Sequence, residues 1–281
     1  MNCKSNAVPV QTPRNIKQLR NLRFKHLQQS RLSQDALYNL HEIAYDIPGF
    51  VWKITSFPDL ICICGLQEIL DELDRVLVLD SPSQMLSYDT TFQLGDFYVS
   101  PLIFRHVLFK QCPCIPAMFL IHERKFTATH KEMLKVCTRT VPALLKTKCL
   151  LVTDKEKAIV NAIRTELPGV KVVHCWNHIL RDIRMWCRKH GAPTCDISVY
   201  CDHLLQLFHS PTEVEYERRL QERREMWDST FASYYMQEIH PDVHQSVGRW
   251  VLEEHNVYNP YSGVTNNQSE SFNRLVILRY Y

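Results

Sequence analysis

The sequence has no uncharged apolar stretch of about eighteen residues, the length that a helix needs to cross a membrane. Its first residues, 1–11, are polar and lack the apolar segment of a secretory signal peptide. Internal repeats and low-complexity segments are also missing. We therefore expect a globular protein that works inside the cell and has no membrane partner.

The cysteines do not indicate a disulfide scaffold, although the chain of 281 residues contains eleven of them. Their number is odd, the chain is long, and Cys62, Cys64 and Cys149 lie in apolar, strand-like runs. We expect reduced, mostly buried thiols. With 45% hydrophobic residues, the chain has enough apolar surface for one large domain or for one domain with an insertion.

Positive charge is concentrated at the start of the chain, although the net charge is only +3. The first 34 residues contain no acid and seven basic residues: Lys4, Arg14, Lys17, Arg20, Arg23, Lys25 and Arg31. Apolar residues at helical spacing predict a basic amphipathic helix between about residues 14 and 32. Five of its side chains are candidate DNA contacts, namely Arg14, Lys17, Arg20, Arg23 and Lys25, and a solvated face packed on the protein is the alternative.

The central part of the chain predicts an α/β fold. Three β-rich runs (MLSYDTTFQL, FYVSPLIFRHVLF and CIPAMFLIHER) follow one another closely, which is typical of an antiparallel meander. Two helical segments then alternate with the short apolar runs KCLLVTD and VKVVHCW, which read as strands buried on both faces. Together these segments predict a mixed sheet covered by helices.

The remaining segments set the expected domain organisation. Residues 177–263 show helical texture and no strand pattern, and the charged run EVEYERRLQERREMW reads as a solvated helix face. The segment TNNQSESFNRLVILRYY begins like a capping box, which places Glu270 in the first turn of a short, truncated helix. We expect a basic helical arm (1–49), a connecting strand and helix (50–83), the first part of the core (84–176), an all-α insertion (177–263) and a final core helix (264–281).

Two aspartates occupy positions in the predicted strands that are typical of functional sites. Asp89 lies inside the first β run, where a buried carboxylate needs a cation or a hydrogen-bond donor. Asp154 ends the run CLLVTD, at the carboxyl end of an expected parallel strand, where open α/β sheets place their sites. If the two strands are neighbours, the carboxylates meet. Taken singly, each acid has an ordinary alternative: an edge salt bridge for Asp89, a helix N-cap for Asp154, and a first-turn acid for Glu270.

The order of these motifs resembles that of the Mutator-like (MULE) transposases, which are DDE enzymes with an RNase H-like core. The matching blocks cover about residues 84–281: SYDTTF with Asp89, LLVTDKEKAI with Asp154, HCWNH, a helical insertion, and NNQSESFNR with Glu270. The resemblance implies an RNase H-like mixed sheet of five strands, flanked by helices and interrupted by an all-α insertion.

The resemblance also implies a nuclear DNA transposase. Asp89, Asp154 and Glu270 would be its catalytic residues and would hold two Mg²⁺ or Mn²⁺ ions for phosphodiester cleavage and strand transfer. Its partners would be transposon ends and target DNA, with a homo-oligomer as a further expectation. Arg274, one turn after Glu270, would contact phosphate or form a simple salt bridge.

Cys175 and His178 match the Cys-x-x-His element of the family. Two ligands do not complete a structural zinc site, so we expect them to support the fold or the active site and expect no structural zinc. His174, Cys187, His190 and Cys195 are the alternatives that would complete such a site. Asp182 stands where the family often has Asn.

A second hypothesis is a domesticated protein that keeps the fold and binds DNA or a protein without cutting. The acidic triad favours an active enzyme, whereas the first 80 residues lack zinc-finger spacing or another DNA-reading module. The related hAT superfamily is a third possibility, although the block around Glu270 fits the MULE pattern better. For the tryptophans of the insertion, packing in a helical core is favoured over stacking on an unpaired base.

Overall fold

The computed structural model describes residues 18, 35–79, 85–90, 92–94, 97–146 and 149–265. Several residues of the sequence predictions lie outside this part of the chain: Arg14, Lys17, Arg20, Arg23, Lys25, Glu270 and Arg274. The expected basic helix and most of the expected final helix lie outside it as well. Within the described ranges, no helix is both long and apolar enough to cross a membrane.

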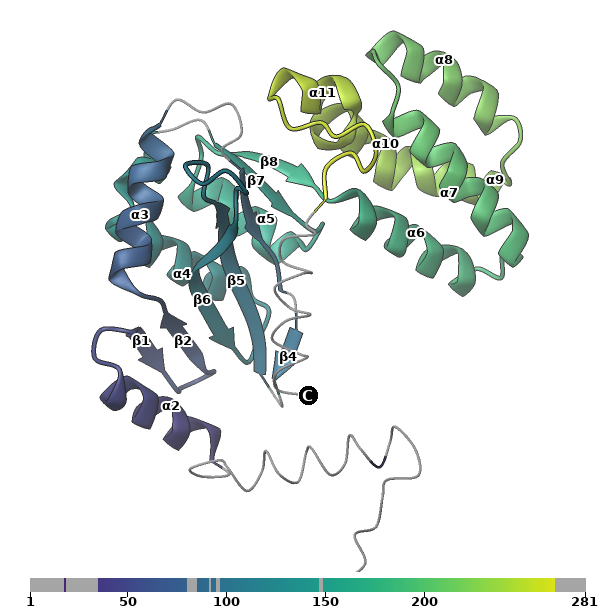
Figure 1. Ribbon diagram of the computed structural model, residues 1–281. Coiled ribbons are helices and arrows are strands. Elements are labelled where there is room, and N and C mark those ends of the chain that lie inside the picture. Colours follow the sequence, from purple (N-terminus) through teal and green to yellow (C-terminus); the bar gives the residue numbers. More distant parts are fainter. Residues whose placement is uncertain are drawn as a thin grey trace, which may run out of the picture.

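The centre of the fold is a mixed sheet of eight described strands (Figure 1). They are β1 (Val51–Thr55), β2 (Ile61–Cys64), β3 (Met85–Tyr88), β4 (Phe92–Leu94), β5 (Phe97–Arg105), β6 (Cys114–His122), β7 (Leu150–Thr153) and β8 (Lys171–His174). The strand order is β1-β2-β6-β5-β3-β7-β8, with β4 paired to β5. Strands β3, β7 and β8 are parallel to one another, and the other pairs are antiparallel. The predicted α/β class with a mixed sheet is confirmed.

The sheet has more strands than the five that were expected. Residues 50–64 do not form one strand but a hairpin, β1 and β2, whose second strand pairs with β6. The break falls at Pro58, which has no N–H to give to a strand ladder. The first β run is also divided: β3 ends at Tyr88, and β4 resumes the antiparallel pairing with β5 at Phe92.

Helices α3 (Gln67–Val78), α4 (Thr127–Thr140) and α5 (Lys157–Glu166), with the short 3-10 turn Pro142–Leu145, cover one face of the sheet. Their apolar residues pack with Leu86 and Tyr88 of β3 and Leu151 of β7 in one core. Before β1, helix α2 (Ala36–Asp46) begins after Asp35, whose Oδ1 accepts from the amides of Leu37 and Tyr38. Aspartate is one of the residues preferred at this capping position.

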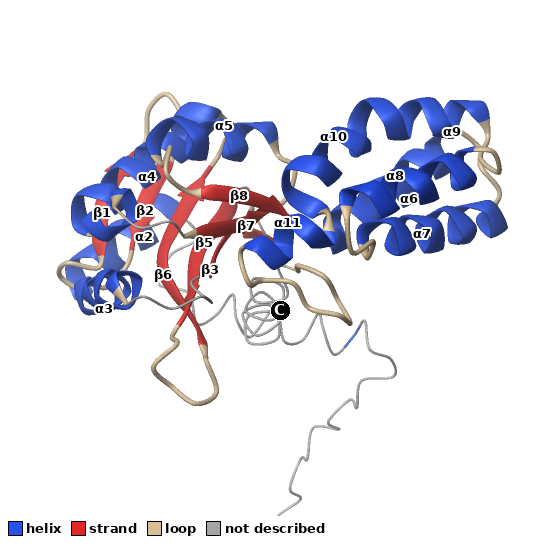
Figure 2. Ribbon diagram, turned by 90° about the horizontal axis from the view of Figure 1, so that it is seen from above, coloured by secondary structure: helices blue, strands red, loops and turns tan. Residues whose placement is uncertain are grey.

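After β8 the chain is helical: α6 (Trp176–Lys189), α7 (Thr194–Phe208), α8 (Glu213–Arg224), α9 (Ser229–Tyr234), α10 (His240–Asp242) and α11 (Arg249–Glu254). Two π-helical turns, η2 (Tyr235–Ile239) and η3 (Val243–Val247), flank α10. These helices lie together to one side of the sheet, beyond the end of β8 (Figures 1 and 2).

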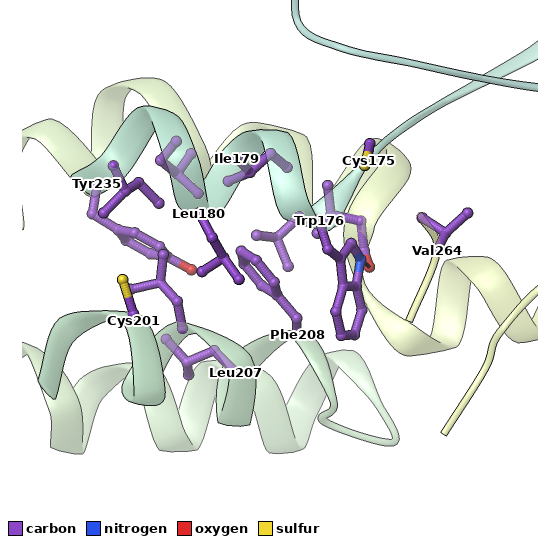
Figure 3. Packing of buried hydrophobic residues seen from close by; sticks show 14 of the residues in the cluster. Cys175, Trp176, Ile179, Leu180, Cys201, Leu207, Phe208, Tyr235 and Val264 are labelled. Atoms are coloured by element: carbon purple, nitrogen blue, oxygen red, sulfur yellow. Dashed lines mark hydrogen bonds between the residues drawn. The ribbon is translucent and has the colours of Figure 1, made fainter. Parts of the chain in front are cut away.

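Trp176, which is 1% exposed, belongs to the hydrophobic core that these helices share (Figure 3). Its indole Nε1 donates to the carbonyl of Val247 at 3.0 Å, and its backbone amide donates to the carbonyl of Val264 at 3.0 Å. Gly263 has a φ of +60°, and a Cβ there would lie 2.3 Å from the Trp176 ring. The chain that leaves the sheet at Trp176 therefore returns to the same place at Val264.

Candidate active site

The register of the sheet brings the two predicted aspartates to the same level. Strands β3 and β7 are parallel neighbours that pair Met85 with Leu150 and Ser87 with Val152, a constant offset of 65 residues (150 − 85). Asp89 and Asp154 are the first residues after these strands and differ by the same 65 (154 − 89). The condition that the sequence analysis set, two neighbouring strands with their carboxyl ends together, is met.

Side chains along a strand point alternately to the two faces of the sheet, and this alternation places Asp89 and Asp154 on the same face. Met85, Leu150 and Val152 belong to the core that includes the helices after β8, whereas Leu86 and Leu151 belong to the core under α3, α4 and α5. Because successive side chains point to opposite faces, positions 85, 87 and 89 share a face with 150, 152 and 154. Asp89 and Asp154 are thus placed on the face where α6 begins.

Cys175 and His178 join this edge of the sheet from the next strand. Strand β8 pairs His174 with Thr153, and the amide of Cys175 donates to the Thr153 carbonyl at 3.0 Å. His178 lies in the first turn of α6, and its Nε2 is 3.6 Å from Oδ2 of Asp89. The Cys-x-x-His element therefore lies beside the first aspartate, with Cys175 buried in the core and His178 against the carboxylate.

The two carboxylates have different surroundings. The Asp89 side chain is 3% exposed, and a charge removed from water in this way is costly without a cationic or hydrogen-bonding partner. Nε2 of His178, at 3.6 Å, is a candidate for that partner. Asp154 is half-buried, and its Oδ1 accepts from the amide of Glu156 at 2.9 Å, two residues on. That bond resembles the helix-capping alternative, although α5 begins only at Lys157.

Lys155 connects the loop after β7 to the helical part, a contact that no sequence motif indicated. Its Nζ donates to the carbonyl of Glu238 at 2.6 Å and forms an ion pair with Asp242. His174 Nε2 lies 3.9 Å from Oδ1 of the same aspartate. Burial lowers the pKa of His174 and opposes the raising effect of Asp242, the next largest influence. The loop that carries Asp154 is thereby held against η2 and α10.

The other residues weighed as zinc ligands with Cys175 lie in separate environments. Cys187 is buried in the helical core, the His190 ring stacks on Trp186 at 4.0 Å, and the exposed thiol of Cys195 donates to the adjacent Asp196. Across the described ranges, neither Cys175 nor His178 belongs to a group of three metal-capable side chains at ligand distance.

We predict that Cys175→Ser leaves the zinc content of the purified protein unchanged, because among the described residues Cys175 belongs to no group with the ligands of a structural site. Elemental analysis of chelator-washed wild type and variant, with His190→Gln as a second variant, measures this. Loss of one bound zinc per chain in Cys175→Ser would contradict it.

Behind the strand ends lies a buried polar cluster on the opposite face. The Tyr88 hydroxyl donates to Nδ1 of His130 at 2.8 Å, and the His130 and His122 ring centroids are 5.1 Å apart. His122 in turn contacts Ser100 Oγ at 3.0 Å. Burial, followed by the nearby His122 and Lys125, lowers the pKa of His130 to about 3. The folded protein holds this ring neutral.

We predict that His130 makes the protein less stable in acid. A histidine in an unfolded chain has a pKa of about 6.5. Below that pH the unfolded protein therefore binds a proton at this histidine, whereas the folded protein does not. Stability from this group is complete above that pH and is lost as pH falls toward the folded pKa, with a slope of up to about 1.4 kcal/mol per pH unit. His130→Asn, whose amide oxygen replaces Nδ1 as acceptor, should flatten the curve by about that slope. Urea unfolding at several pH values tests this, and parallel curves for the two proteins would contradict it.

Comparison of the sequence with models of known protein families gives no match, and comparison with curated proteins gives none.

Proposed function

We propose that this protein is a DDE-type DNA transposase of the Mutator-like kind, with Asp89, Asp154 and Glu270 as its catalytic carboxylates. The observation that carries the proposal is the shared offset of 65 residues, which sets Asp89 and Asp154 side by side at the ends of β3 and β7. The run β6-β5-β3-β7-β8, an antiparallel meander followed by two parallel strands, supports an RNase H-like core. Strands β1 and β2 would then be an extension at its edge.

The third carboxylate is within reach of the other two. Val264 is hydrogen-bonded to Trp176, which directly follows Cys175 at the end of β8. Glu270 is the sixth residue after Val264, and six residues span at most about 20 Å. This length allows Glu270, which lies outside the described residues, to reach the two aspartates.

The donor set fits the ions that the resemblance implies. Carboxylate oxygens are the ligands that Mg²⁺ and Mn²⁺ prefer, and Asp89 and Asp154 supply them from one face of the sheet. When bound, two such ions would activate a water or a DNA 3′-hydroxyl and stabilise the leaving oxygen. The imidazole of His178 holds the Asp89 carboxylate in position, and Lys155 fixes the loop of Asp154.

The proposal is tested by cleavage and joining of DNA that carries the inverted repeats flanking the gene. Because the ions are required, we expect nicking and strand transfer with Mg²⁺ or Mn²⁺ and none with chelator. Binding of these ends without cleavage under any divalent ion would instead support the domesticated, non-cutting alternative. The basic residues of 1–32 and Arg274 remain proposed phosphate contacts in either case.

A further inference from the structure

A second cluster of metal-capable side chains lies in the helical part, away from the aspartates. It consists of Glu217 on α8, His240 at the start of α10 and His244 in η3, whose possible ligand atoms all lie within 4.8 Å of one another. Nε2 of His240 is 3.9 Å and Nε2 of His244 is 2.9 Å from the same oxygen, Oε1 of Glu217. Two imidazoles thus converge on one carboxylate.

The other nitrogen of each ring already has a partner. Nδ1 of His240 lies 2.7 Å from the hydroxyl oxygen of Tyr216, which can accept a hydrogen bond from the ring N–H, and Nδ1 of His244 lies 3.0 Å from Oε1 of Glu213. Metal-binding histidines usually have their second nitrogen fixed by a carboxylate or another polar group, which sets the tautomer and aims the free nitrogen at the ion. The Glu213 contact matches that arrangement directly, and the Tyr216 contact fixes the His240 ring.

The local backbone also departs from regular helix at these residues. The π-helical turns η2 and η3 flank α10, so His240 follows one of them and His244 lies within the other. Such turns are rare and occur frequently at functional sites, where they re-aim side chains. Here they accompany the approach of two histidines to a glutamate from a different helix.

We propose that Glu217, His240 and His244 bind one divalent transition-metal ion, with Zn²⁺ as the best match. Two imidazoles and one carboxylate are a common zinc ligand set, and tetrahedral coordination places ligand atoms about 3.3 Å apart. The Glu217 oxygen is 2.9 and 3.9 Å from the two histidine nitrogens, so small side-chain shifts would reach that geometry. The Glu217 side chain is 49% exposed, so water can reach the ion as a fourth ligand. The site is independent of the proposed DNA cleavage and differs from the sequence expectation of no structural zinc.

The ion would fasten α8 to α10 and η3. Asp242, two residues from each histidine, forms the ion pair with Lys155, the neighbour of Asp154. Metal binding therefore stiffens the helical segment against which the Asp154 loop rests.

The test uses the full chain, stripped with chelator and titrated with Zn²⁺, with stoichiometry from elemental analysis after dialysis and stability from thermal melting. We expect one equivalent per chain and a melting temperature that rises with zinc. Glu217→Gln and His244→Gln should each lower zinc affinity by at least about 100-fold, and Tyr216→Phe, which removes only the supporting hydroxyl, by about 10-fold. Glu222→Gln, an exposed acid of α8 that pairs with Arg218, is the matched control and should bind zinc like wild type.

Cobalt substitution identifies the ligands. Co²⁺ at this site should give visible d–d bands without sulfur-to-cobalt charge transfer, because no thiol takes part. A charge-transfer band that disappears in Cys112→Ser would assign the metal to the exposed Cys112 and Cys114 and overturn the proposal. Absence of saturable zinc binding by wild type, or equal binding by wild type, Glu217→Gln and His244→Gln, would overturn it as well.

Discussion

Replacing Asp154 by Asn is expected to abolish nearly all DNA cleavage while leaving the protein folded. The substitution removes one negative charge from the pair that the register of β3 and β7 sets side by side, and divalent ions depend on that charge. It changes little else, because an Asn side-chain oxygen accepts the 2.9 Å bond from the Glu156 amide as the carboxylate does. Cleavage assays beside circular dichroism separate the loss of chemistry from loss of structure.

The matched control for this variant is Asp202→Asn, which makes the same change at an exposed position of α7. It should cleave DNA at the wild-type rate. Equal activity of Asp154→Asn and wild type would remove Asp154 from the site and reduce it to the helix-capping role. In that role the variant would instead lose stability, by about 0.5 to 2 kcal/mol if the lost interaction resembles a cap.

Trp176→Ala is expected to lower the free energy of unfolding by about 3 to 5 kcal/mol, the usual cost of truncating a buried aromatic residue. The ring is packed against Phe208 and His209, at centroid distances of 5.3 and 4.8 Å, and against Gly263. Its Nε1 also satisfies the carbonyl of Val247. Urea unfolding measures the loss.

Met185→Ala on the same helix is the control, because its side chain is 59% exposed, and it should change stability by no more than about 0.5 kcal/mol. A Trp176→Ala loss as small as the Met185→Ala loss would show that the helical part and the sheet do not share one core. A large loss supports the view that Trp176 ties the start of α6 to the returning chain at Val264.

Hydrophobic patterning was sufficient to predict the centre of the fold. The short apolar runs before Asp154 and through Val173 have the length and composition of buried strands, and they form β7 and β8. The β1–β2 hairpin was missed because its two strands are separated by a short turn at Pro58 and share one continuous apolar texture. Pairing of β2 with β6 is a long-range contact that local patterns do not encode.

The sequence predicted those site residues that directly follow a strand, because the end of a strand fixes where the next residue lies. Asp89 and Asp154 follow strands whose adjacency the sequence could only assume, and the register supplies it. The contact between His178 and Asp89 agrees with the supporting role predicted for the Cys-x-x-His element. Glu270 stays a prediction, since it lies outside the described residues.

Contacts between distant helices were not predictable. Lys155 meets Asp242 across 87 residues (242 − 155), and Glu217 meets His244 across 27 (244 − 217). Neither pair has a spacing that any motif describes, because helix packing, not sequence proximity, brings them together. The sequence analysis interpreted the charged residues of α8 as a solvent-exposed helix face. It therefore did not predict that Glu213 and Glu217 of this helix lie close to histidines.

The most direct test of the carboxylate site is thermal melting with and without Mn²⁺. It is best made in Glu217→Gln protein, so that ions bound at the histidine cluster do not contribute. At about 100 times the dissociation constant, binding adds about 2.7 kcal/mol, which corresponds to a rise of about 5 to 10 °C for a chain of this size. We predict that rise with Asp89 and Asp154 intact. In Asp89→Asn and Asp154→Asn it should vanish, while the metal-free variants melt no lower than their parent, because repulsion between the carboxylates is relieved. A melting temperature indifferent to Mn²⁺ when both aspartates are present would contradict the proposed site.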